Sequence, residues 1–331
     1  MSSKWTVISG RWPVVALCVL FVMALTGCHQ KAEEVTFHRF DHLLFDTPVD
    51  QLQQEIIKHR DEYTSELILL YPEEPGFMEM TQSFVSDPVM CDIYRITDSL
   101  YHDLSDVERE LGKALARAYE LCPNMGHVER FYTMVTGDFD SYGFRVFSNT
   151  QDLCVGLDFY ALGAMERYQY FGMPNYLVRT LSREYIVPDC MLTLANLHLA
   201  SPDGERTLLD HAIADGKKLY FLEKTMPGIA DTIMLRYTGE QMAWMERNVA
   251  NVWAWLIQNK MLYSTDQADY RNLMGDAPHT NAFGPESAPR TTSYIGWQIV
   301  RRYMKKSGAT MQELLDEADS RKILDESGWR P

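Results

Sequence analysis

Between residues 128 and 157 the chain changes character, and this change constrains its fold more than any other feature. Three short segments, 131–135, 144–147 and 153–157, are rich in β-branched and aromatic residues and are separated by Gly-Asp and Asn-Thr turns. Segment 35–40 has the same character. Helical patterns lie on both sides of the three segments. The sequence therefore predicts a single α+β domain that is mostly helical and has a small central sheet.

Residues typical of helix starts place most of the helices. Thr47-Pro48 predicts a helix start, helices are expected from there to about residue 71, and further helices are expected at 89–102 and 105–121. Ser201-Pro202 predicts another start, and beyond Pro174 the chain is expected to be mostly helical. Three pairs have the spacing of a capping box: Ser105 with Glu108, Thr238 with Gln241, and Thr310 with Glu313.

The first 27 residues are not expected to belong to this domain. Lys4 and Arg11 precede or flank an apolar run of about a dozen residues, whereas a membrane-spanning helix needs about 20. The run ends in Leu25-Thr26-Gly27-Cys28, which resembles the lipobox of bacterial lipoprotein signals. That resemblance implies export, cleavage before Cys28 and attachment of acyl chains such as palmitate at this cysteine. We therefore expect a signal peptide at 1–27, a lipidated tether at 28–34 and the folded domain at 35–331.

The expected mature chain is strongly acidic. The full sequence has a formal net charge of −15, which becomes −17 when Lys4 and Arg11 leave with the signal peptide. Such a surface repels phosphate backbones, so no nucleic-acid partner is expected. Anionic lipid headgroups repel it as well, so we expect the acyl chains to hold the protein at the membrane.

The sequence leaves the state of the remaining cysteines open. Their spacings match no metal-binding cysteine motif. In an oxidising compartment they could form two disulfides, and as free buried thiols they would pack like small apolar residues. The four are Cys91, Cys122, Cys154 and Cys190.

No intact catalytic motif is found, so we expect neither enzymatic activity nor a cofactor. The chain has no His-Glu-x-x-His, no Gly-x-Ser-x-Gly, no phosphate-binding glycine-rich loop and no Cys-x-x-Cys. His211 and Asp215 lie four residues apart on one helical face, and with His198 they could form a three-ligand metal site. The alternative is a solvated His/Asp pair on the shoulder of a helix.

The helix expected from residue 290 carries an unusual stripe of side chains. Arg290, Tyr294, Trp297 and Arg301 share one face, so two guanidinium groups flank two aromatic rings. As a functional site, the stripe would be a recognition groove. As a structural feature, it would contain an internal ion pair, with Glu286 of the preceding loop as the carboxylate.

Two tryptophans lie opposite the apolar face of the helix that starts at Thr238. Met245, Val252 and neighbouring apolar residues form the core-facing side, whereas Trp244 and Trp255 project from the other side. Either the helix packs on both sides, or the tryptophans form an exposed binding patch.

Five motifs stand out in the C-terminal third, at 208–222, 237–244, 262–266, 284–290 and 295–304. Taken together and in order, they resemble the gliding-motility lipoprotein GldB family of Bacteroidetes. Phe40-Asp41 and Leu44-Phe45-Asp46 also fit this family. The resemblance covers most of the mature chain, and its specificity comes from the combination of motifs.

This resemblance implies an envelope lipoprotein associated with gliding and with the type IX secretion apparatus, without an assigned reaction. We therefore expect an outer-membrane lipoprotein that faces the periplasm or the cell surface. Its expected partners are the membrane, through the lipid anchor, and envelope proteins of the gliding or secretion machinery. The expected role is non-catalytic binding or assembly, with contacts near Trp244, Trp255, Arg290 and Trp297.

A second resemblance bears on mechanism. A small sheet, a helix, an Asp-Gly inside a second helix and an Ile-Gly-Trp helix follow one another as in gluzincin-type metallopeptidases. This implies a zincin-like layout with Asp215 at the third zinc ligand, although the helix around 182–199 offers His198 as its single histidine. The alternatives to an assembly role are a metal-dependent hydrolase that uses His198, His211 and Asp215, and a binder of envelope glycans or peptides.

Overall fold

The computed structural model describes residues 32–63, 65, 67–68, 70–166 and 172–331. The expected signal peptide and the lipidation site Cys28 lie outside these residues. One compact unit begins at Ala32. Within it the backbone N–H of Glu33 donates to the carbonyl of Gly112 at 3.0 Å, so the last residues of the expected tether already pack on the fold.

Four short strands form one mixed sheet close to the predicted positions. They are β1 (Phe37–Arg39), β2 (Arg130–Met134), β3 (Val146–Ser148) and β4 (Asp152–Gly156). Their order is β1-β2-β4-β3, with β1, β2 and β4 parallel and β3 antiparallel to β4. The prediction of a mostly helical α+β fold with a small sheet is confirmed.

The sheet is covered on both faces, and alternate residues of its strands enter two different cores. Phe131 and Leu153 belong to the larger core, whereas their neighbours Tyr132 and Cys154 belong to the smaller one. This division follows from the two-residue period of a strand. Because parallel strands buried on both faces carry few polar residues, the central strands read as short apolar runs.

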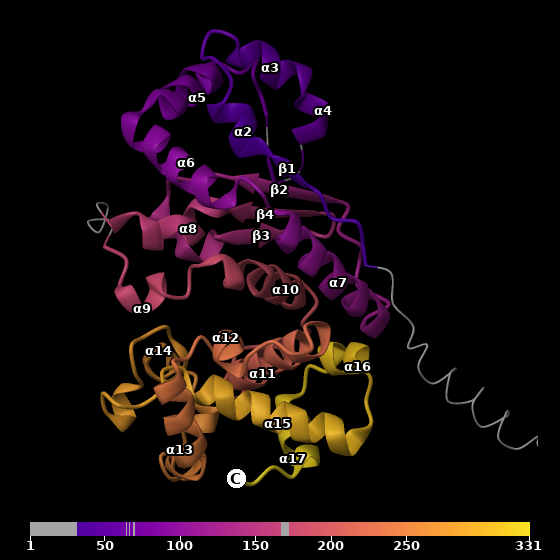
Figure 1. Ribbon diagram of the computed structural model, residues 1–331. Coiled ribbons are helices and arrows are strands. Elements are labelled where there is room, and N and C mark those ends of the chain that lie inside the picture. Colours follow the sequence, from indigo (N-terminus) through magenta and orange to yellow (C-terminus); the bar gives the residue numbers. More distant parts are fainter. Residues whose placement is uncertain (1–31, 64, 66, 69, 167–171) are drawn as a thin grey trace, which may run out of the picture. The chain divides into compact units, whose positions relative to one another are not determined.

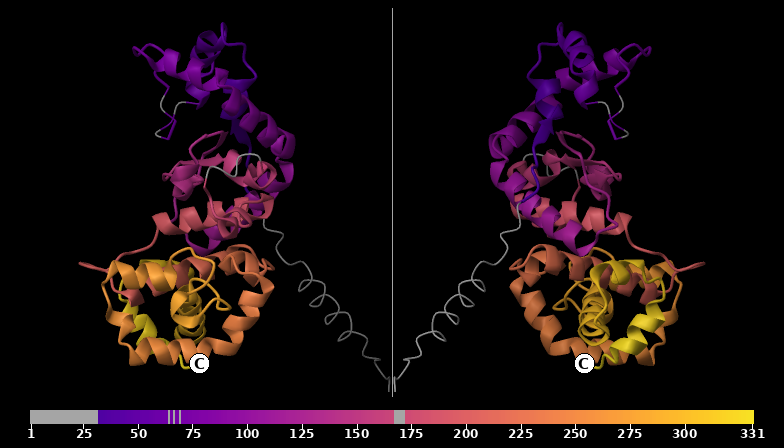
Figure 2. Two further views of the ribbon diagram at one scale, coloured as in Figure 1. Left: turned by 90° about the vertical axis from the view of Figure 1, so that its left-hand side faces the viewer. Right: turned by 90° about the vertical axis from the view of Figure 1, so that its right-hand side faces the viewer.

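The first four helices after β1 pack into the smaller core, the next two pack into the larger core on the other face, and later helices complete the fold (Figure 1). The helices of the first part are α2 (Phe40–Phe45), α3 (Leu52–Lys58), α4 (Arg60–Tyr63), α5 (Phe77–Ser86), α6 (Pro88–Tyr101) and α7 (Ser105–Leu121). After the sheet come α8 (Leu157–Ala161), α9 (Asn175–Val178) and α10 (Ile186–Leu197). The last are α11 (Leu208–Thr225), α12 (Asp231–Leu235), α13 (Gly239–Gln258), α14 (Gln267–Met274), α15 (Thr291–Ser307), α16 (Met311–Asp316) and α17 (Ser320–Ser327). Figure 2 shows α11 to α17 gathered into one bundle.

Several predicted helix starts are confirmed, and others are wrong for local reasons. The capping boxes at Thr238 and Thr310 begin α13 and α16. Ser201 does not begin a helix, because the capping box of Thr207 and Asp210 starts α11 later in the chain. Thr47 does not begin one either, since its hydroxyl donates to the Leu43 carbonyl at the end of α2.

The predicted capping box of Ser105 and Glu108 is also wrong. The Glu108 carboxylate accepts a hydrogen bond from the backbone N–H of Phe37 at 2.8 Å, which links α7 to β1. Asp103 accepts the N–H of Ser105 instead, at 2.8 Å. The Glu108 side chain therefore makes a long-range contact with β1 and does not cap its own helix.

Helices α11 and α15 cross with their backbones in contact. A Cβ on Gly216 would collide with the carbonyl of Gly296, and a Cβ on Gly296 would collide with the carbonyl of Ala212. Two glycines facing each other are thus required for the helices to approach this closely. The crossing places Asp215, the neighbour of Gly216, against the first turn of α15, where the Ser293 hydroxyl donates to it at 2.7 Å.

The structure also answers two questions about membrane-spanning helices and the state of the cysteines. Among the described residues, no helix combines the length and apolar character needed to cross a bilayer. Cys91, Cys122, Cys154 and Cys190 are all free thiols, of which Cys91 is exposed and the others are buried.

The glycine crossing yields a stability prediction. Gly296→Ala should lower the free energy of unfolding by about 1–3 kcal/mol or more, because the added methyl group overlaps a backbone carbonyl that cannot move independently. Chemical denaturation monitored by circular dichroism measures this. Gly239→Ala is the matched control: a Cβ there meets nothing within 4 Å, so the change should be neutral or slightly stabilising. Equal effects of the two substitutions would contradict the close crossing.

Candidate binding groove

A groove with a cavity volume of about 520 Å³ lies between the β3 region and α10 on one side and α11, α14 and α15 on the other. Seven of its 20 described lining residues are charged, and we call it the charged groove. The cations are Arg145, Lys218, Arg236 and Arg290, and the acids are Asp189, Asp215 and Asp276.

Asp189 forms the first of two ion clusters in this groove. It lies in the first turn of α10, is almost fully buried and accepts bonds from Arg145 at 2.7 and 3.1 Å. Arg236 and the hydroxyl of Tyr160 also bond to it, the latter at 2.7 Å. Burial favours the neutral acid, but the two guanidinium groups outweigh burial and lower the pKa of Asp189.

Asp215 forms the second cluster. Lys218 lies 2.6 Å from one carboxylate oxygen, and Arg290 lies 3.6 Å from the other, which also accepts the Ser293 hydroxyl. Burial would raise the pKa of Asp215, but Lys218, Arg290 and Ser293 together lower it to about 2. The carboxylate is therefore ionised throughout the physiological range.

Each cluster holds two cations around one carboxylate, so each carries an excess positive charge. With exposed Asp276 included, the described residues of the lining have four cationic and three acidic groups and are net positive, although the whole chain carries −15. Arg236, Arg145, Arg290 and Lys218 have side chains that are 10% to 25% exposed, so each is held in place but reaches the groove. An anionic group could therefore be bound here without a prior rearrangement.

Two of the groove arginines occupy an unfavourable backbone conformation. Arg236 (φ 58°) ends α12 and Arg290 (φ 48°) precedes α15, and both lie in the left-handed region. A residue other than glycine in this region costs energy, of order 1–3 kcal/mol, and persists where surrounding contacts fix it. Such strain gathers at functional sites. Two cationic residues of one groove carry this strain, which is typical of a functional site.

The potential metal ligands His198, His211 and Asp215 are not brought together as one site. His211 and Asp215 line a second hollow beside the charged groove, where the His211 ring packs on Tyr270 with centroids 4.5 Å apart. His198 lies at the end of α10, and burial lowers its pKa. Among the described residues, these three do not form a group with ligand atoms within 4.8 Å of one another.

The stripe on α15 is divided between two places. Arg290 enters the charged groove, whereas Arg301 lies over the ring of Trp297, 4.8 Å from its centroid. Glu223 of α11 accepts the indole N–H of Trp297 at 3.1 Å and pairs with Arg301 at 3.4 Å. Tyr294 is buried edge-on against the same indole.

The predicted ion pair between Arg290 and Glu286 is wrong. Glu286 is exposed, and the carboxylate near Arg290 belongs to Asp215. Glu286 is close to Arg290 in sequence, but the crossing of α11 and α15 places Asp215, from a distant part of the chain, beside Arg290. A half-buried acid already beside Arg290 can pair with it without drawing an exposed loop inward.

Trp244 and Trp255 pack on the protein rather than forming a fully exposed patch. Both are half-buried, and both contact Phe283, with ring centroids 6.1 and 5.3 Å away. Helix α13 therefore packs on both sides, as one of the two interpretations predicts.

The sequence did not identify the Asp189 cluster as a site. Arg145, Asp189 and Arg236 come from three distant segments and share no spacing that would indicate contact. The one local signal was an acid in the first turn of an otherwise apolar helix, since a buried acid needs a cationic partner.

Comparison with known proteins gives one match. A family model described as gliding motility protein GldB matches residues 28–331, a span that begins at the predicted lipidation site. No curated protein and no solved structure matches the chain. The zincin-like layout therefore stays a prediction.

The Asp215 cluster predicts a specific pH dependence. The folded-state pKa of about 2 lies below the value of about 3.9 for an unfolded aspartate, so ionised Asp215 stabilises the fold above that value, by up to about 2–3 kcal/mol. This contribution disappears as pH falls from about 4 to about 2. The difference in unfolding free energy between wild type and Asp215→Asn, from urea titrations, should shrink over that interval. Asp276→Asn, at an exposed groove position, is the control. A wild-type advantage that stays constant with pH would contradict the role of the charge.

Proposed function

We propose that this chain, which belongs to the family of the gliding motility protein GldB, is a non-catalytic envelope lipoprotein that binds an acidic segment of another envelope protein in the charged groove. Family membership supports a lipoprotein of the cell envelope associated with gliding motility. The single observation that carries the ligand class is the excess of cations in the groove, with two around the carboxylate of Asp189 and two around that of Asp215.

The composition of the groove favours a charged ligand. Sites for small organic molecules are mostly apolar with a few polar groups. Here seven lining residues are formally charged, and Arg145, Arg236 and Arg290 present guanidinium groups. A guanidinium matches a carboxylate in two parallel hydrogen bonds, so a glutamate or aspartate side chain of a partner is a fitting occupant.

The overall acidity of the chain makes this attraction local. A partner segment with several acids is repelled by most of the surface and attracted at the groove. Added salt screens both effects at distances beyond about 8–10 Å, whereas a contact inside the groove is screened less. Overall charge thus favours specificity for a segment that can enter the groove.

The membrane anchor completes the proposal. Acyl chains on Cys28 would keep the acidic domain at the outer membrane, on its periplasmic or outer side, within reach of the gliding or type IX secretion apparatus. Among the described residues, His198 is not assembled with His211 and Asp215 into one ligand set, which weighs against a hydrolase that uses these three residues.

A substitution that replaces a single atom tests the anchor. Cys28→Ser removes the sulfur that carries the lipid, so the chain should no longer be cut before residue 28 or labelled by a fatty acid. Metabolic labelling with an alkyne fatty acid, with immunoblots of membrane fractions, measures both. Cys18→Ser, within the apolar run, is the control and should leave processing unchanged. A labelled, normally processed Cys28→Ser protein would contradict the anchor.

The groove can be tested by crosslinking in cells. A photoreactive amino acid at Asn196, an exposed residue that lines the groove, should capture a defined envelope protein. Lys218→Gln should reduce that adduct several-fold, because it removes one cation at a cost of about 1 kcal/mol while retaining most of the side-chain volume.

The matched control is Lys58→Gln. Lys58 also pairs with an acid three residues away, Glu55 at 2.9 Å, but lies on α3, away from the groove. A photoreactive residue at exposed position Arg247 tests whether a partner contacts the surface of α13 instead. If the adduct at position 196 persists in Lys218→Gln at the wild-type level, the cationic groove is not the binding site.

A further inference from the structure

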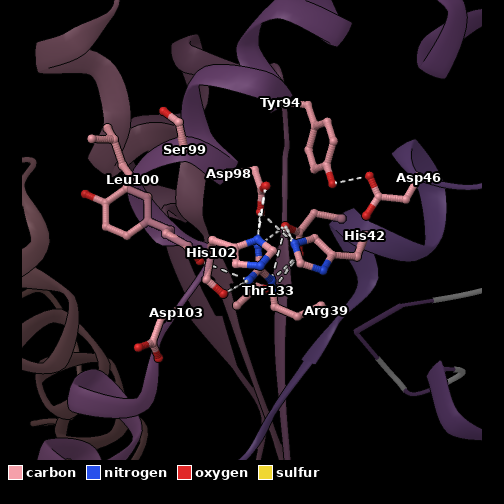
Figure 3. A network of polar contacts seen from close by, with 12 residues as sticks. Arg39, His42, Asp46, Tyr94, Asp98, Ser99, Leu100, His102, Asp103 and Thr133 are labelled. Atoms are coloured by element: carbon pink, nitrogen blue, oxygen red, sulfur yellow. Dashed lines mark hydrogen bonds and ion pairs between the residues drawn. The ribbon is translucent and has the colours of Figure 1, made fainter.

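Helices α2 and α6 bring together three side chains that the sequence analysis does not single out. His42 lies on α2, Asp98 lies in the last turn of α6, and His102 directly follows that helix. Figure 3 shows the two imidazole rings gathered at the Asp98 carboxylate. Within the described ranges, these residues form a group whose ligand atoms all lie within 4.8 Å of one another.

The spacing of these ligand atoms is close to that of a metal site. Nε2 of His42 lies 2.8 Å from Oδ1 of Asp98, and Nδ1 of His102 lies 3.2 Å from both carboxylate oxygens. A tetrahedral ion with bonds of about 2.0–2.2 Å separates its ligand atoms by about 3.4 Å. Relative to Asp98, a bound ion would require the His102 nitrogen to move by about 0.2 Å and the His42 nitrogen by about 0.6 Å.

Arg39 is a positive charge that contacts this cluster, and Asp41 is its main partner. Its Nε and Nη2 bond to Asp41 at 3.1 and 2.6 Å, and Nη2 makes a longer bond to Oδ1 of Asp98 at 3.5 Å, which a bound ion would replace. Its Nη1 donates to the carbonyls of Tyr101 and His102 at 2.9 and 3.3 Å. Arg39 is thus balanced mainly by buried Asp41, and it holds the backbone from which His102 projects.

We propose that His42, Asp98 and His102 bind a divalent transition-metal ion, with Zn²⁺ as the first choice. Imidazole nitrogen and carboxylate oxygen are ligands that zinc accepts. The His102 side chain is 77% exposed and the other two are about a quarter exposed, so an ion can enter from solvent and a water can take the fourth position.

The proposed ion would act as a clamp between two helices. His42 belongs to α2, which follows β1 directly, while Asp98 and His102 belong to the end of α6. A metal that binds the folded state and not the unfolded chain stabilises the fold by mass action. This site is separate from the charged groove, whose lining contains none of these three residues.

The test uses the full-length lipoprotein without a histidine tag, stripped with a chelator and dialysed. Competition with a chromophoric zinc chelator should give one Zn²⁺ per chain. His42→Gln and His102→Gln should each weaken binding about tenfold or more, because loss of a direct ligand costs at least as much as loss of a residue that supports one. Zn²⁺ should raise the melting temperature of the wild type and not of these variants.

His59→Gln is the matched control. His59 also contacts carboxylates, Glu62 at 3.0 Å and Glu55 at 3.5 Å, but belongs to no described three-ligand group. The His59→Gln variant should bind Zn²⁺ as tightly as the wild type does. Because His102 is exposed, His102→Gln should fold normally, which circular dichroism checks. Wild-type protein that binds no stoichiometric Zn²⁺, or variants at 42 and 102 that bind as tightly as wild type, would overturn the proposal.

Discussion

The close crossing of α11 and α15 is the constraint on which the C-terminal half of the structure depends. Gly216 and Gly296 allow the two backbones to touch, and no side chain larger than hydrogen fits at either position without movement. The same contact fixes the neighbours of the glycines. Asp215 meets Ser293 and approaches Arg290, so a packing requirement and an ion cluster arise from one crossing.

The groove follows from this arrangement together with the buried acid of α10. Asp189 draws Arg145 and Arg236 from separate segments, and Asp215 draws Lys218 and Arg290, so four cations are fixed around two carboxylates. Desolvation offsets part of the attraction within each cluster. Each cluster also lies beside strained backbone, at Arg236 or at Arg290, a combination that is typical of a functional site.

Features set by local sequence could be predicted, and features set by long-range contact could not. The strands and the capping boxes at Thr238 and Thr310 depend on a few adjacent residues. Glu108 failed as a cap because Phe37 recruits it from another part of the chain. In the same way, Arg290 is near Asp215 and not Glu286. Two of the three residues in the His42 cluster, Asp98 and His102, have helical spacing that the sequence displays, whereas His42 reaches them only through the fold.

The account depends most on the claim that the groove binds carboxylates. Isothermal titration of the purified lipoprotein with an acidic model peptide, and with its counterpart in which Gln and Asn replace Glu and Asp, measures this directly. The account predicts binding of the acidic peptide that weakens with added salt and with Lys218→Gln, and no binding of the neutral peptide. Equal affinity for the two peptides, or no binding of the acidic one, would contradict it.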